Sequence, residues 1–170
     1  GGGIAGEQGI LVDERMRTSV DNIWAAGDVA QARDFFGNAR VLNGILPDAV
    51  EQGRIAGMQM AGDLTASDYA GGVPLNTYSF FGKQALSVGT DGSAFADAEV
   101  HKSFDPQAGR YMKIVMRDDR LLGIFSIEHW IDAGVMWELI LRRTGLGPVK
   151  AEFLADPQRA ARVLMSKTWR

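Results

Sequence analysis

The pattern of apolar and polar positions in the first half of the chain predicts one helix among short extended segments. A helix is expected over residues 47–61, because proline is favoured in the first helical turn and Gly62 offers a C-terminal cap. Residues 23–26 form an apolar run that is too short for a helix and suits a buried strand. Residues 31–46 lack clean periodicity and are predicted to be a loop-rich connection.

The predicted helix carries small residues on one side, which include Ala49, Gly53, Ala56 and Gly57. Glycine inside a helix lowers its stability. Two internal glycines therefore suggest that this side of the helix lies close to another backbone.

The second half reads as a series of strands followed by helices. Strand-like runs punctuated by Gly, Asp and Pro occupy residues 76–81, 84–89, 98–104, 111–117 and 121–128. Helices are expected at 131–144 and 157–167, the second opened by Asp156 as cap and Pro157 as first residue. The chain changes character over 62–74, so we place two domains at 1–65 and 66–170 within an α+β fold.

Composition narrows the classes of function. The chain is 46% hydrophobic and 23% charged, with net charge −3 and a sequence pI of about 5.4, so nucleic acid and anionic membrane are not expected partners. The absence of cysteine excludes disulfides, thiolate nucleophiles and cysteine-bound metals within this sequence. No apolar run approaches the ~20 residues of a membrane span, and a cytoplasmic location is expected. The glycine-rich start without Met suggests a piece of a longer polypeptide.

The stretch from Thr18 to Ala30, TSVDNIWAAGDVA, is the most informative in the sequence. A threonine precedes an apolar run that ends in Gly27-Asp28. The stretch resembles the second flavin-binding motif of the FAD-dependent pyridine nucleotide-disulfide oxidoreductases. The resemblance implies that Asp28 accepts a hydrogen bond from a ribityl hydroxyl of FAD. The residue types agree, because Gly27 permits close backbone approach and a carboxylate accepts from several hydroxyls.

The helix that follows the motif looks like the family helix whose N-terminus points at the flavin ring. Its first turn contains Leu46, Pro47 and Asp48, and a helix N-terminus stabilises negative charge on a reduced ring. Asp48 is expected to point away from the ring, since its charge would oppose this effect. The candidate cofactor-binding residues are therefore Gly27, Asp28, Leu46, Pro47 and Asp48, and no residue is assigned to catalysis or to a metal.

The resemblance covers roughly residues 9–145 and implies the tail of an FAD-binding α/β domain. A small antiparallel sheet with helices on one face, used for dimerisation, would follow it. The glutathione reductase branch has a His-Pro pair in this domain, whereas here His129 precedes Trp130. Members similar to NADH oxidase, nitrite reductase and rubredoxin reductase therefore fit better. His129 is expected to serve packing, His101 to lie at a surface or edge, and Asp132 to cap the following helix.

These predictions are consistent with two alternative functions. In the first, a longer parent enzyme transfers hydride from NAD(P)H to FAD and passes electrons to an acceptor. NAD(P)H and most of the FAD would be bound by residues upstream of this sequence, which alone is expected to be inactive. In the second, the C-terminal domain forms a homodimer or docks a redox protein without catalysis. An Asp28 that merely caps a turn in an unrelated α/β fold is the alternative to the flavin motif.

Overall fold

The computed structural model describes residues 3–168, with the backbone alone at 167 and 168. The chain forms two compact units, Gly1–Val73 and Pro74–Arg170. The division falls after Val73, eight residues beyond the boundary that the sequence suggested after residue 65. Each unit has its own sheet and its own core.

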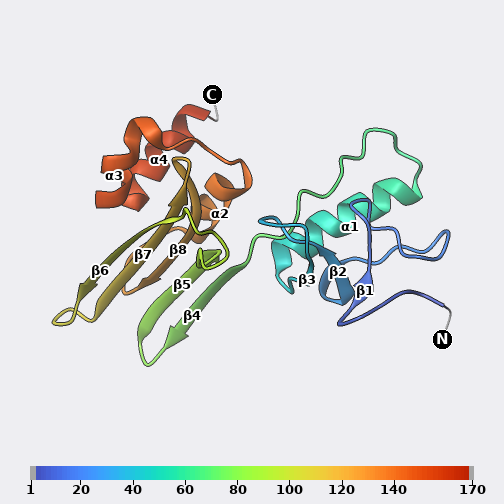
Figure 1. Ribbon diagram of the computed structural model, residues 1–170, viewed down its shortest axis with the longest axis horizontal. Coiled ribbons are helices and arrows are strands. Elements are labelled where there is room, and N and C mark those ends of the chain that lie inside the picture. The colour runs from blue at the N-terminus through green and yellow to red at the C-terminus, as the bar shows by residue number, and fades with distance from the viewer. Residues whose placement is uncertain (1–2, 169–170) are drawn as a thin grey trace. The chain divides into compact units, whose positions relative to one another are not determined.

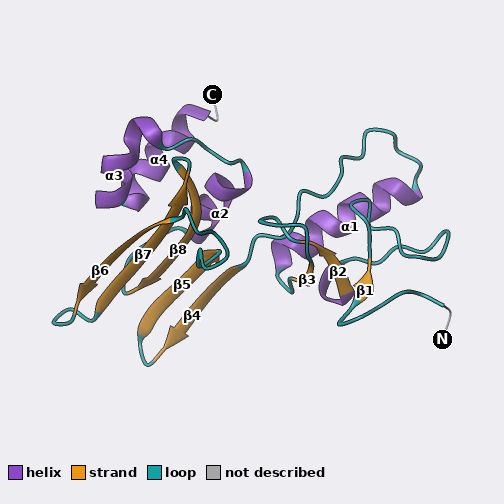
Figure 2. Cartoon of the chain, in the orientation of Figure 1, coloured by secondary structure: helices purple, strands orange, loops and turns teal. Residues whose placement is uncertain are grey.

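The first unit is built on a small three-stranded sheet and one long helix. Strand β1 (Ile10–Leu11) pairs in parallel with β2 (Ala30–Arg33), which pairs antiparallel with β3 (Arg40–Leu42). The short helix η1 (Gly27–Val29) leads into β2, and helix α1 (Leu46–Met60) follows β3 (Figure 2). The predicted helix over 47–61 is therefore confirmed.

Helix α1 contributes Ile55 and Ala56 to the core of the first unit. The core also contains Val12, Met16, Ala25, Ala30, Ala32 and Tyr69. The helix ends as the sequence suggested, because Gly62 adopts φ +70 and its N–H donates to the Gln59 carbonyl. Gly53 and Gly57 are exposed, and a Cβ added at either would meet no atom within 4 Å in the described part of the chain.

Two local predictions for the first unit are wrong. Residues 23–26 form no regular strand, because their pairing is limited to one bridge between Trp24 and Arg17. Thr18 closes the turn before it, where its N–H donates to the Ile23 carbonyl at 3.0 Å. The loop expected over 31–46 contains most of β2 and all of β3, which pair across a turn. These strands are too short to show a period, so tertiary pairing decides them.

The second unit is an antiparallel sheet of five strands in the order β4-β5-β8-β7-β6 (Figure 1). The five predicted strands are confirmed to within one or two residues at their ends. Their bounds are β4 Leu75–Phe80, β5 Lys83–Gly89, β6 Glu99–Asp105, β7 Arg110–Arg117 and β8 Arg120–Ile127.

Helices α2 (Ala133–Leu141), α3 (Lys150–Ala155) and α4 (Pro157–Thr168) follow this sheet, the last two after the short helix η2 (Gly147–Val149). The α+β class with a small antiparallel sheet and helices is confirmed, and Figure 2 shows the helices gathered beside the sheet. Side chains from both layers form the core, among them Val88, Ile114, Ile124, Met136, Leu139 and Phe153.

The helix caps follow the sequence. The Asp132 carboxylate accepts from the Val135 N–H at 3.1 Å, and the Asp156 carboxylate accepts from the Arg159 N–H at 3.0 Å. Helix α3 was not predicted, because at six residues it is shorter than a window that shows helical periodicity.

Candidate functional site

The turn at Gly27-Asp28 is held against the side of helix α1. Gly27 adopts φ +76, a conformation that side chains other than glycine rarely tolerate. Its N–H donates to the Oε1 atom of Gln52 at 2.8 Å, and a Cβ added at Gly27 would lie 3.5 Å from the Cβ of Ala49. The sequence therefore places glycine where the backbone must turn sharply beside the helix.

Asp28 is exposed, next to Gly44 of the segment that enters α1. A Cβ added at Gly44 would lie 3.5 Å from the Asp28 Oδ1 atom, so the absent side chain leaves room beside the carboxylate. Among residues 3–168, no protein group donates a hydrogen bond to this carboxylate. Asp28 thus offers several free acceptor positions to a ligand, and its hydrogen bonding gives no support to a turn-capping role.

The N-terminus of α1 carries no side-chain cap. Ile45 occupies the capping position in an extended conformation, and Pro47 stands in the first turn. Leu46 is 77% exposed, so the start of the helix is open to its surroundings. Unpaired N–H groups and the positive end of the helix dipole together suit an anionic or electron-rich ligand.

Asp48 lies in the first turn of α1, but its carboxyl is buried and held by protein groups. Asn43 Nδ2 donates to Asp48 Oδ2, and a Cβ added at Gly72 would lie 2.8 Å from the same oxygen. Burial raises the pKa of Asp48 to about 6, while the neighbouring Tyr69 hydroxyl and Asn43 amide lower it in part. The Asp48 carboxyl is therefore enclosed by Asn43, which precedes the helix, and by Tyr69 and Gly72, which follow it.

A polar cluster of the buried residues Asp48, Gln52 and Tyr69, with half-buried Asn43, connects this carboxyl to the Gly27 turn. Gln52 is 2% exposed and Tyr69 is 4% exposed. The Tyr69 hydroxyl lies beside both Asp48 and Gln52, without a well-aligned hydrogen bond to any described residue. Asn43, Gln52 and Tyr69 were not predicted from the sequence. The signal for Gln52 was its spacing of four from Asp48, which puts both on one helix face.

The two histidines considered in the sequence, His101 and His129, both lie in the second unit. His101 lies on β6, an edge strand, 3.6 Å from Glu99, as expected for an edge residue. Burial is the main cause that lowers the pKa of His129, and the nearby Arg110 charge adds to it. Within residues 3–168, no group of three or more His, Asp or Glu is arranged to hold a metal ion. None of the helices described is long and apolar enough to cross a membrane.

Comparison with known proteins relates the chain to one family of oxidoreductases. Residues 2–62 match the family described as pyridine nucleotide-disulphide oxidoreductase. The whole chain is 52% identical, over 171 residues, to the NADH-dependent phenylglyoxylate dehydrogenase subunit epsilon of Aromatoleum evansii, of which it covers 40%. It is also 29% identical to a Bacillus subtilis nitrite reductase [NAD(P)H], over 71% of this chain and 14% of that protein.

A solved structure described as an FAD-dependent pyridine nucleotide-disulphide oxidoreductase from Desulfovibrio vulgaris shares the fold. It matches 95% of this chain and 43% of that one, with a TM-score of 0.69 and 22% identity. The sequence matches confirm that the chain is related to the pyridine nucleotide-disulphide oxidoreductases, and the solved structure shows a shared fold. The chain spans less than half the length of these relatives.

Proposed function

We propose that this chain is part of an FAD-dependent NAD(P)H oxidoreductase and that its first unit holds the middle of the flavin cofactor. The observation that carries the proposal is the exposed, unpaired Asp28 carboxylate, beside Gly44, in the turn that Gln52 ties to α1. The flavin motif in the sequence and the names of the relatives, which include NADH-dependent and FAD-dependent enzymes, support it.

The residues present fit the ribityl chain and the ring of FAD. Asp28 would accept hydrogen bonds from ribityl hydroxyls, because an ionised carboxylate is a strong acceptor for several donors. Gly27 would let the ligand approach the backbone. Leu46, Pro47 and the open N-terminus of α1 would lie near the electron-rich edge of the ring, where the helix dipole favours negative charge.

The placement of Asp48 agrees with this role for the helix. Its carboxyl is enclosed by Asn43, Tyr69 and Gly72, and its raised pKa of about 6 reduces its negative charge near that pH. A partly protonated Asp48 opposes the positive charge at the helix N-terminus less than a fully ionised aspartate would. Asp48 would thus be a positioning residue rather than a ligand of FAD.

FAD, when bound, would accept hydride from NAD(P)H and release electrons to an acceptor. This chain's own residues bind and orient the cofactor and are not proposed to donate or accept protons. NAD(P)H and the FAD pyrophosphate would be held by residues outside this sequence. The use of NAD(P)H favours a cytoplasmic location.

The proposal is tested by replacing Asp28 in the complete gene product that contains this chain. Asp28→Ala should weaken FAD binding by about tenfold to a hundredfold, the loss of ~1.5–3 kcal/mol expected for hydrogen bonds to a charged acceptor. Asp21→Ala, at another exposed aspartate in a nearby turn, is the matched control and should bind FAD as the parent does. Binding is followed by flavin absorbance and fluorescence titration.

Equal loss of FAD in both variants would assign the effect to folding rather than to Asp28. A folded parent protein that takes up no FAD at all would overturn the flavoenzyme proposal. In that case the second candidate function, a homodimerisation or redox-protein docking module, would remain. That candidate is supported by the separate compact unit Pro74–Arg170 and by relatives described as subunits.

A further inference from the structure

The five-stranded sheet of the second unit has one covered face and one open face. Alternation along the strands puts Leu86, Val88, Ile114 and Ile124 on the face that packs against the helices, where they are buried. The opposite face is covered only at one end, where Lys113 Nζ donates to the Asp91 carbonyl and Gly92 packs on Val115. Beyond the segment 90–98, which contains Asp91 and Gly92, no element in the described part of the unit covers the opposite face.

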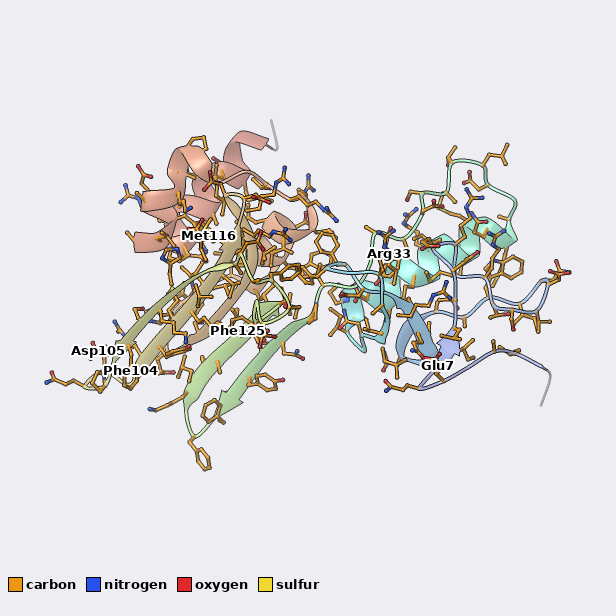
Figure 3. The ribbon with its side chains drawn as sticks, viewed as in Figure 1. Glu7, Arg33, Phe104, Asp105, Met116 and Phe125 are labelled. Atoms are coloured by element: carbon orange, nitrogen blue, oxygen red, sulfur yellow. The ribbon has the colours of Figure 1, made fainter. Side chains whose placement is uncertain are left out.

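An apolar row crosses the open face from one edge strand to the other. Cross-strand pairing aligns Tyr78, Ala85, Ile127, Tyr111 and Phe104. Its two ends are the most open, since Tyr78 is 55% exposed and Phe104 is 69% exposed. Figure 3 labels Phe104 and, on the adjacent row, Phe125. Aromatic side chains gathered on one accessible surface are typical of protein interfaces.

Outside the covered end, the charged strand residues on the open face are lysines, whereas Arg117, on the same side of β7, is ion-paired with Asp97 at 2.9 Å. Lys83 pairs with Phe80 beyond the apolar row, and Lys102 pairs with Lys113 beside it. Lys113 also lies 5.4 Å from the centroid of the Phe125 ring. Two like charges directly opposite each other in a sheet are unfavourable unless a counter-charge is present.

No carboxylate from this part of the sheet supplies that counter-charge. The strand positions on the open face include no Asp or Glu among the paired residues of β4 to β8. Asp91, in the loop at the end of this face, accepts from the N–H and the hydroxyl of Ser93, and its charge also interacts with that of Lys113. The open face is therefore basic, although the whole chain has a net charge of −3.

We propose that the open face docks a second protein through an acidic surface with an apolar centre. Carboxylates of the partner would pair with Lys83 and Lys102, and its apolar centre would cover Tyr78 and Phe104. A second copy of this chain fits less well, because two open faces brought together would oppose lysines to lysines. The proposal does not depend on the flavin site, since all its residues lie in the second unit.

The test uses the complete gene product and, as an acidic and aromatic probe, a random copolymer of glutamate and tyrosine. The protein should bind the copolymer, and binding should weaken at high ionic strength as screening increases. Lys102→Glu and Phe104→Ala should each weaken binding by about tenfold, as expected for residues that carry an interface. The matched control Arg162→Glu, an exposed charge on α4, should bind as the parent does.

Three results would overturn the proposal. The first is absent binding, or equal weakening by the control, which would make the attraction nonspecific. The second is binding to vesicles of phosphatidylserine and phosphatidylcholine without binding to the copolymer, which would indicate a membrane. The third is self-association in sedimentation that Phe104→Ala abolishes, which would assign the face to a second copy. FAD content, measured on the same samples, reports separately on the flavin proposal.

Discussion

The backbone N–H of Gly27 and the side-chain Oε1 atom of Gln52 are joined by a 2.8 Å hydrogen bond between residues 25 apart in the sequence. This contact fixes the turn that presents Asp28 against the middle of helix α1. It makes Gln52, which the sequence pattern did not single out, the residue on which the geometry of the candidate site depends.

Replacing Gln52 should loosen the Asp28 turn. Gln52→Leu leaves the half-buried Gly27 N–H without its acceptor, which costs about 1 kcal/mol. Gln52→Glu keeps an oxygen in place and should retain the contact. Hydrogen exchange of the Gly27 amide measures the effect directly, and exchange should accelerate in the leucine variant alone. Unchanged exchange in that variant would mean that the turn is held by other contacts.

Asp48 should make stability depend on pH. Its pKa rises from 3.8 to about 6 on folding because burial disfavours the charged form. The folded state therefore binds more protons than the unfolded state between these values, and stability should fall as pH rises from about 4 to about 6. The fall should reach at most about 3 kcal/mol and should level off at higher pH.

The variant Asp48→Asn tests this dependence, since it removes the charge and keeps an oxygen that accepts from Asn43. It should be more stable than the parent at pH 7 and nearly equal at pH 4, as measured by urea denaturation. A stability difference that stays constant over this range would contradict the assignment of the pH dependence to Asp48.

The glycines on the small side of α1 should be replaceable in this chain. Gly53 and Gly57 are helical, and a Cβ at either meets no atom of the described residues within 4 Å. Alanine is favoured over glycine inside a helix by about 1 kcal/mol, so Gly53→Ala and Gly57→Ala should each raise stability by roughly that amount. Thermal denaturation monitored by circular dichroism measures the change, and lower stability would show that this side is closely packed.

Gly123 should tolerate no side chain. A Cβ at this position would lie 2.1 Å from the Thr90 carbonyl oxygen, where strand β8 passes the end of β5. Gly123→Ala should therefore destabilise the second unit by about 3 kcal/mol, as backbone must shift to relieve the contact. Gly145→Ala is the control, because within the part of the chain that the structure describes a Cβ there meets nothing within 4 Å. Equal urea midpoints for the two variants would contradict the close approach.

The regular elements were predictable because their signals are local. The strands of the second unit alternate and are bounded by Gly, Asp and Pro, and helix α1 begins at a proline and ends before a glycine. Asp132 and Asp156 identified their helix starts by the same local chemistry. Residues 23–26 looked like a strand for a local reason too, but a strand also needs a partner along its length, and Trp24 has one bridge.

The sequence by itself determined the class of protein, through the stretch that ends in Gly27-Asp28, and the order of α1, the five strands of the second unit, α2 and α4. Only the tertiary structure decided which side chains surround the site. Gln52, Tyr69 and Asn43 reach it from positions set by packing, and burial alone raises the pKa of Asp48. The basic face of the sheet likewise depends on strand register, because pairing brings Lys102 opposite Lys113 from different strands. Contacts between distant residues follow from packing, which no local pattern encodes.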